Sequence, residues 1–391
     1  MKVLPATICH LYLLFAITTY SQSPTYDTAE VQRIVRRIQT LQATEEKGFF
    51  DGMFPAYREY HHRRGKLKND DNIFFTGIIA FTLRRLQPLL DSTSSNICDS
   101  ILASASTVYR HYKSTSGRPS YNFWQKDPPE IFPNGGWLNL FNKAKALADD
   151  LDDTAILSMA QNSADSTALQ VHTLMQAYTN TKERPAKGTL EMYRNIYAYS
   201  SWFGEMMPRE MDVCILSNAL LFVHSYHLPY SAADSASITF ISKVVENRHY
   251  LQEGLAISPN YPRTPVIIYH IARLMSESTI PELEKQRPQL IADAKDCYKK
   301  TTNFLDRVML STSLLRLGVQ IPYQNFYIDS NLETLVEDNN FIFFQANMFS
   351  LFNRRLNKLI DKLGIGKFYY YCPAWNETLL LENLIWSTRV R

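Results

Sequence analysis

The chain has 391 residues, of which 41 are Lys or Arg and 38 are Asp or Glu, so its formal net charge is +3. This balance lacks the basic excess of a nucleic-acid-binding protein, and we expect no nucleic-acid partner. Five cysteines without a CxxC pair predict no zinc site.

The first 21 residues predict a secretory signal peptide. Met1 and Lys2 precede a mostly apolar run that ends near Tyr20. This run is not apolar enough to span a membrane. No other stretch is long and apolar enough either, so we expect no transmembrane segment. The sequence therefore predicts an exported protein, periplasmic or secreted, with residues 22–391 forming one domain. Four cysteines remain after residue 21, and they either form two disulfides or stay as isolated thiols: Cys98, Cys214, Cys297 and Cys372.

Apolar residues recur at helical spacing along almost the whole of the mature chain. Twelve helices are expected, near residues 28–44, 71–87, 92–113, 152–161, 164–181, 210–226, 232–249, 264–277, 281–302, 304–317, 344–363 and 375–388. Amphipathic helices alternate with helices that are apolar nearly all round, and a helix apolar on all sides is buried on all sides. The alternation predicts an all-α fold, an (α/α)6 toroid of six inner and six outer helices. An α-solenoid would show a clearer fixed period.

Several expected inner helices begin with polar residues. Parallel inner helices would bring these residues to one mouth of the toroid, where they would form a polar-rimmed pocket. The candidates from the helix starts are Asp71, Asp149, Asp150, Asp152, Asp153, Thr154, Glu210, Asp212 and Arg263. The candidates from the aromatic loops before them are Trp124, Trp137, Phe203 and Tyr261. For any single position, a helix cap or an aromatic seal is the alternative interpretation.

The segment 149–155 places four carboxylates in five positions, Asp149, Asp150, Asp152 and Asp153, followed by Thr154 and Ala155. Carboxylates this close repel one another, so at least one is expected to hold a proton near neutral pH. A protonated carboxyl group is a candidate general acid. The alternative is a helix N-terminus, where one or two acids would suit the helix dipole.

The residues Asp150 to Ala155 also resemble the D-x-D-D-T-A motif of class II terpene cyclases, and the expected toroid resembles the β-domain of these enzymes. The resemblance implies that Asp152 protonates an alkene or epoxide, with Asp150 and Asp153 as polarising neighbours and Thr154 as hydrogen-bond support. It also implies an isoprenoid or other small apolar or amphipathic ligand, and aromatic faces that stabilise cations. No cofactor is implied, except Mg²⁺ if the substrate is a diphosphate. Asp149, Asp150 and Asp153 also form the D-D-x-x-D of class I terpene synthases, but the partner motif N-D-x-x-S-x-x-x-E is missing.

Three features depart from the class II pattern. The chain is long enough for one domain rather than two, the Q-x-x-x-G-x-W repeats are missing, and the protein is expected to be exported. A second hypothesis is therefore an exported glycan hydrolase or lyase, in which Asp152 pairs with Asp71, Glu210 or Asp212. A third is a non-catalytic binding module.

The basic segment 61–64 is expected to be solvated, with an anionic ligand as the alternative.

Overall fold

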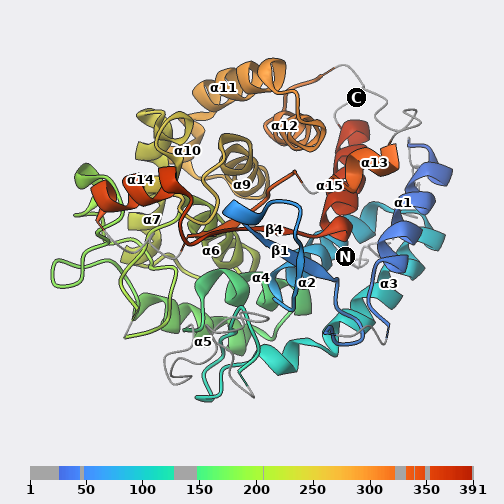
Figure 1. Ribbon diagram of the computed structural model, residues 1–391, viewed down its shortest axis with the longest axis horizontal. Coiled ribbons are helices and arrows are strands. Elements are labelled where there is room, and N and C mark those ends of the chain that lie inside the picture. The colour runs from blue at the N-terminus through green and yellow to red at the C-terminus, as the bar shows by residue number, and fades with distance from the viewer. Residues whose placement is uncertain are drawn as a thin grey trace, which may run out of the picture.

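The computed structural model describes residues 26–44, 48–126, 148–205, 207–321, 332–338, 340–347 and 353–389. These residues form a mostly helical protein with one small antiparallel sheet (Figure 1). The helical character agrees with the all-α prediction, and the sheet corrects it.

Six long helices contact one another in a closed cycle. They are α2 (Phe74–Leu86), α4 (Leu151–Gln161), α6 (Val213–Ser225), α9 (Thr264–Glu277), α12 (Phe304–Arg316) and α15 (Pro373–Arg389). Each packs against the next in this order, and α15 packs against α2 (Figure 1). The sequence explains the burial of α2, α6, α9 and α12, because these helices are apolar nearly all round; in α6, every residue from Val213 to Val223 is buried.

Five further long helices pack against this cycle with one face. They are α1 (Thr28–Thr40), α3 (Ser92–Ser106), α5 (Asp165–Gln176), α7 (Ala232–Glu246) and α11 (Arg287–Lys300). In α1, the buried residues Val31, Ile34, Val35 and Ile38 form one stripe at helical spacing. In the described ranges, the remaining α-helices are α8 (Gly254–Ile257), α10 (Pro281–Glu284), α13 (Leu332–Val336) and α14 (Arg354–Leu363).

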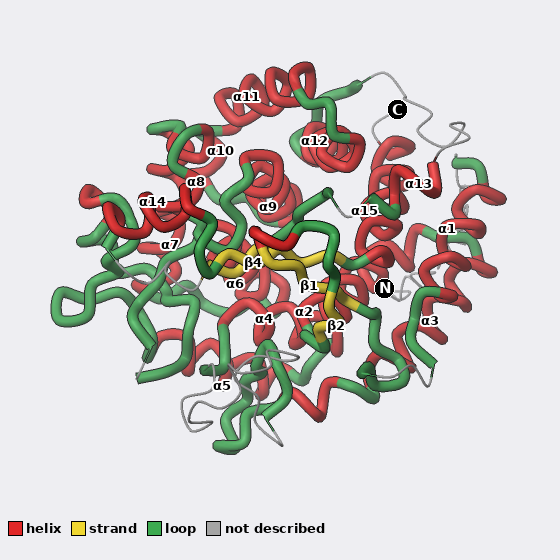
Figure 2. Tube along the Cα trace, viewed as in Figure 1, coloured by secondary structure: helices red, strands yellow, loops and turns green. Residues whose placement is uncertain are grey.

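The sheet has the strand order β2-β1-β4-β3, and all its strand pairs are antiparallel. Its strands are β1 (Ala56–Tyr60), β2 (Lys68–Asp70), β3 (Gln345–Asn347) and β4 (Lys367–Tyr371). Strand β2 leads into α2 and β4 into α15, while the Gln345 amide donates to the Asn260 carbonyl, shortly before α9. The sheet therefore lies at the end of the molecule where these three helices begin, and Figure 2 shows it in front of them.

The expected helix 344–363 is wrong in its first part. Residues 345–347 form β3, and α14 begins only at Arg354. The aromatic run 368–371, which falls between the expected helices 344–363 and 375–388, lies in β4 and pairs with β1 and β3. A short apolar run does not distinguish a strand from a helix, because the choice depends on the partner strand. The expected helix 281–302 is divided into α10 and α11, and most other boundaries move by a few residues.

The four cysteines among the described residues are free thiols, and of these only Cys297 is not fully buried. Within the described ranges, the structure contains no helix that is both long enough and apolar enough to cross a bilayer. The segment 1–21, expected as a signal peptide, lies outside the described residues.

Candidate functional site

The acidic segment forms the beginning of α4, and Asp150 is its N-cap residue. The Asp150 side chain accepts a hydrogen bond from the Asp153 amide at 2.7 Å. Thr154 Oγ1 donates to the Asp150 carbonyl at 2.6 Å and accepts from the Tyr121 amide at 3.0 Å. An N-cap carboxylate satisfies an amide that has no partner within the helix. Asp150 and Thr154 therefore have a structural role, which leaves the other acids of the cluster to be explained.

The carboxylates of Asp150 and Asp153 form a buried pair. Burial raises the pKa of Asp150 to about 7. Burial first, and then the charge of Asp150 and a hydrogen bond to it, hold the pKa of Asp153 well above its usual range. The pair therefore holds a proton near neutral pH, as expected for two acids that cannot both ionise in one buried place.

Asp149 is held apart from this pair by basic and polar partners. Its carboxylate accepts from Ser120 Oγ at 2.9 Å and from Arg118 Nη2 at 3.3 Å, and Lys126 Nζ lies 3.8 Å away. Its backbone carbonyl accepts from the Phe203 amide at 2.8 Å. The negative charge of Asp149 is therefore matched by two cations at the edge of the site.

Asp152 is held by residues from outside its own helix. Its Oδ1 accepts from Asn218 Nδ2 of α6 at 2.6 Å, and its Oδ2 accepts from the Tyr261 hydroxyl at 2.5 Å. Arg273 of α9 donates to Asn218 Oδ1 at 2.5 Å, so a cation supports the amide that holds the carboxylate. Asp152 is 5% exposed. Burial raises its pKa, and the hydrogen bonds from Asn218 and Tyr261 lower it in part.

Aromatic rings pack around the ring of Tyr261, whose hydroxyl contacts Asp152. The Tyr261 ring lies 6.0 Å from Phe74, 5.9 Å from Phe343 and 6.0 Å from Phe344 between centroids. The His270 ring lies 5.0 Å from the Tyr261 ring between centroids, and its Nδ1 contacts the Val266 carbonyl. Burial holds the pKa of His270 well below its usual range, so the imidazole is neutral. The aromatic contacts are thus made by Tyr261, the donor to Asp152, while the carboxyl groups of Asp150, Asp153 and Asp212 interact electrostatically with Asp152 itself.

Glu210 and Asp212 lie close to the same loop. Asp212 caps α6 and accepts from Ser258 Oγ at 2.5 Å and from the Asn260 amide at 2.9 Å. Asn260 also donates to Glu210 Oε1 at 2.9 Å. Burial raises the pKa of Asp212 to about 7. Since Asn260 precedes Tyr261, loop 258–261 links Asp152, Glu210 and Asp212.

Other predicted pocket residues have different partners. Phe203 packs against Tyr178 at 5.7 Å between centroids, beside Asp149 rather than beside Tyr261. Arg263 forms an ion pair with Asp306 and donates to the carbonyl of residue 342 at 2.5 Å.

The beginning of α2 is built around Asp70 rather than Asp71. Asp70 is completely buried, forms an ion pair with Arg58 at 2.6 Å and accepts from Trp124 Nε1 at 3.0 Å. The side chain of Asp71 is half-buried, and its backbone carbonyl accepts from Tyr112. Trp124 therefore anchors a helix start, and Trp137 lies outside the described residues.

The sequence prediction missed Asn218 and Arg273, although both carry a usable signal. Asn218 is an amide within the apolar helix α6, and Arg273 is the one strongly basic residue within α9. A polar side chain inside a helix buried on all sides needs a partner there, because an unpaired buried polar group is costly. That partner was not apparent from the sequence, because it lies on another helix.

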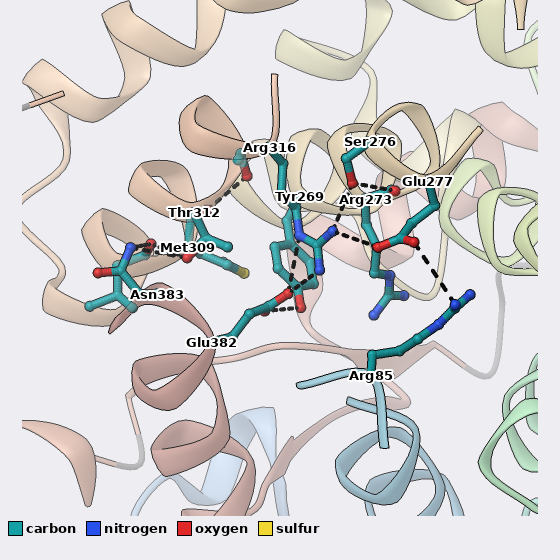
Figure 3. Close-up of polar contacts among 12 residues, drawn as sticks. Arg85, Tyr269, Arg273, Ser276, Glu277, Met309, Thr312, Arg316, Glu382 and Asn383 are labelled. Carbon is teal, nitrogen blue, oxygen red and sulfur yellow. Dashed lines mark hydrogen bonds and ion pairs between the residues drawn. The ribbon is translucent and has the colours of Figure 1, made fainter. Parts of the chain in front are cut away.

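A second buried polar cluster links α9, α12 and α15 (Figure 3). Arg316 donates from Nε and Nη2 to Glu382 Oε1 at 3.1 and 2.6 Å, and Tyr269 donates to Oε2 at 2.6 Å. Arg316 Nη1 donates to Ser276 Oγ at 2.7 Å. The Glu382 carboxylate is thus fully paired, which indicates a structural role in holding the three helices together.

Comparisons with known proteins assign no family to the chain. No family model, no curated protein and no solved structure matches it. Within the part of the chain that the structure describes, no group of three or more His, Cys, Asp or Glu residues is arranged to hold a metal ion.

Proposed function

We propose that the protein is an exported enzyme related in mechanism to class II terpene cyclases, in which Asp152 starts the cyclisation of an isoprenoid by protonating an alkene or epoxide. We further propose that the closed cycle of six helices is the inner ring of an (α/α)6 toroid, with the half-buried helices around it. The observation that carries the proposal is the position of Asp152, which is buried and receives donors from Asn218 and Tyr261.

The contacts of Asp152 suit a general acid. Burial favours the protonated form at rest, because it disfavours the charge. After the proton moves to an alkene carbon or to an epoxide oxygen, the remaining carboxylate has Tyr261 and Asn218 as donors and Arg273 beyond them. These groups are in place before the reaction, so they stabilise the charge that develops on the acid.

The surroundings of Tyr261 favour an apolar substrate over a glycan. A carbocation is stabilised by the faces of aromatic rings, and Phe74, Phe343 and Phe344 supply such faces. A glycan site would need polar groups along an open groove and two carboxylates separated by about 5 to 10 Å. In this proposal, the rings that pack around Tyr261 form the wall of the substrate chamber and move apart when substrate enters.

The decisive experiment compares wild type with Asp152→Asn, which keeps the size of the side chain and removes its acidic proton. The substrates are squalene, oxidosqualene and geranylgeranyl diphosphate, the last with Mg²⁺, and products are identified by mass spectrometry. We expect Asp152→Asn to lower turnover by about 10² to 10⁴-fold, the usual contribution of a general acid.

The matched control is Asp293→Asn on α11, another buried carboxylate, which is held by Arg248 and Tyr250. Circular dichroism melting of both variants shows whether each is folded. Equal turnover by the two folded variants would disprove the role of Asp152. Ligand-induced stabilisation of wild type without turnover would favour a binding module, and cleavage of oligosaccharides would favour the glycan hypothesis.

A further inference from the structure

Helix α14 presents its apolar face to solvent. Leu356, Leu359 and Leu363, together with Ile365 just after the helix, are between 38% and 57% exposed. The leucines recur at helical spacing and therefore share one face. In a helix of a globular protein, such a face normally packs on the core, so the orientation of α14 is the reverse of the usual one.

The polar side of α14 holds it to the rest of the protein. Asn357 is buried, and its Oδ1 accepts from Asn347 at 3.1 Å. Arg354 forms an ion pair with Glu253 at 2.6 Å, and Asp361 forms one with Lys367 at 2.7 Å. These contacts fix the rotation of the helix about its axis, so the exposed leucines are a built feature of the fold.

The tip of the β1–β2 hairpin lies beside the end of α14. His61 packs so closely against Gly364 that no Cβ could fit there, and His61 Nδ1 lies 2.8 Å from the Tyr369 hydroxyl. The tip, residues 61–68, adds an exposed leucine, Leu67. We call the exposed side chains of α14, Ile365 and this tip the apolar–basic surface.

Positive charge surrounds these apolar residues. Residues 61–68 carry four Lys or Arg and no acid, and residues 354–363 carry four Lys or Arg and one acid. Among the described residues, no ion pair is formed by Arg63, Lys66, Arg355 or Lys362, and all four are exposed. Leucines flanked by unpaired cations match a lipid bilayer with anionic headgroups, which accepts apolar side chains below a negatively charged surface.

We propose that the apolar–basic surface binds the protein to bilayers that contain anionic phospholipid, with α14 lying in the plane of the interface. At ten residues, α14 is too short to span a membrane and has the length to lie on one. The surface belongs to the same end of the molecule as the sheet and the beginning of α2, because the hairpin leads through β2 into that helix. The proposal does not depend on the proposed function, although it would place the enzyme beside membrane-dissolved isoprenoids.

The test is co-sedimentation of the full mature chain with phosphatidylcholine vesicles, with and without phosphatidylglycerol. We expect wild type to sediment with the anionic vesicles, and added salt to weaken this binding. The double substitution Leu359→Ser and Leu363→Ser should weaken it by about tenfold or more, because two leucines no longer enter the bilayer. Arg355→Gln with Lys362→Gln should weaken binding to anionic vesicles and leave any binding to neutral vesicles unchanged.

The matched control is Leu169→Ser, an equally exposed leucine on α5. All these positions are exposed, so the variants should fold, and their melting temperatures check this. Absence of wild-type binding to anionic vesicles, or equal binding by the leucine double variant, would overturn the proposal. The proposal would also be overturned if wild type formed a dimer without lipid in analytical ultracentrifugation and the leucine double substitution abolished that dimer. A second copy of the chain would then cover this face.

Discussion

Replacing Tyr261 by Phe removes one oxygen, the hydroxyl that lies 2.5 Å from Asp152 Oδ2. Both residues are buried, so no water takes its place without rearrangement. A hydrogen bond to a charged group contributes about 1.5 to 3 kcal/mol, and one between neutral groups about 0.5 to 1.5 kcal/mol. The loss of unfolding free energy should therefore be about 1 kcal/mol larger when Asp152 is ionised than when it is protonated.

The same difference appears as a shift in the pKa of Asp152. The hydroxyl favours the carboxylate, so its removal raises the pKa of Asp152 further, by about 0.7 pH unit for a difference of about 1 kcal/mol. The pKa of Asp152 is already raised in the folded state, which means that ionisation costs stability as pH rises from the unfolded value of 3.8 through the folded value. Tyr261→Phe should steepen this loss of stability.

The assay is urea unfolding of wild type and Tyr261→Phe at about pH 4 and about pH 8. The control is Tyr199→Phe, which removes a buried hydroxyl 2.9 Å from Asp234 Oδ1. Hydrogen bonds from His172 and Ser231 outweigh burial and lower the pKa of Asp234, so that carboxylate stays ionised over more of this range. Tyr199→Phe should therefore cost nearly the same free energy at both pH values. If Tyr261→Phe also lowered the free energy of unfolding by the same amount at both pH values, Asp152 would not titrate between about pH 4 and pH 8.

Two further predictions concern the buried acids. Burial raises the pKa of Asp150 and of Asp212 to about 7, so the free energy of unfolding should fall as pH rises from about 4 to 7. In urea unfolding, Asp212→Asn should make this fall less steep. An unchanged pH dependence in Asp212→Asn would exclude Asp212 as one of its sources. Glu382→Leu leaves the buried Arg316 without its closest carboxylate, with only Glu277 at 3.3 Å remaining, and should cost about 3 kcal/mol in denaturant unfolding. Adding Arg316→Leu should recover much of that loss, and a double variant as unstable as Glu382→Leu would contradict the explanation.

The positions of most helices, and whether each is half-buried or fully buried, could be predicted from the sequence. Helix α9 begins and ends at the expected residues 264 and 277, because an apolar helical pattern with a proline in its first turn is a local signal. The carboxylate cluster was also accessible, since four acids in five positions must repel one another whatever the fold. The sequence did not show that Asp150 caps α4, that Asp150 and Asp153 share a proton, or that Asp152 is held separately by other elements.

The tertiary structure alone decided the partners. Asn218 and Tyr261 are separated from Asp152 by 66 and 109 positions, and only the packing of α4 against α6 and of α6 against α9 brings them together. The strand β3 was missed for the same reason, because its hydrogen bonds go to β4 and to Asn260 rather than to its own neighbours. The sequence determined which residues had to be buried or paired, through local periodicity and charge. Long-range packing chose the partner of each, because a buried polar group accepts any suitable donor that the fold brings within reach.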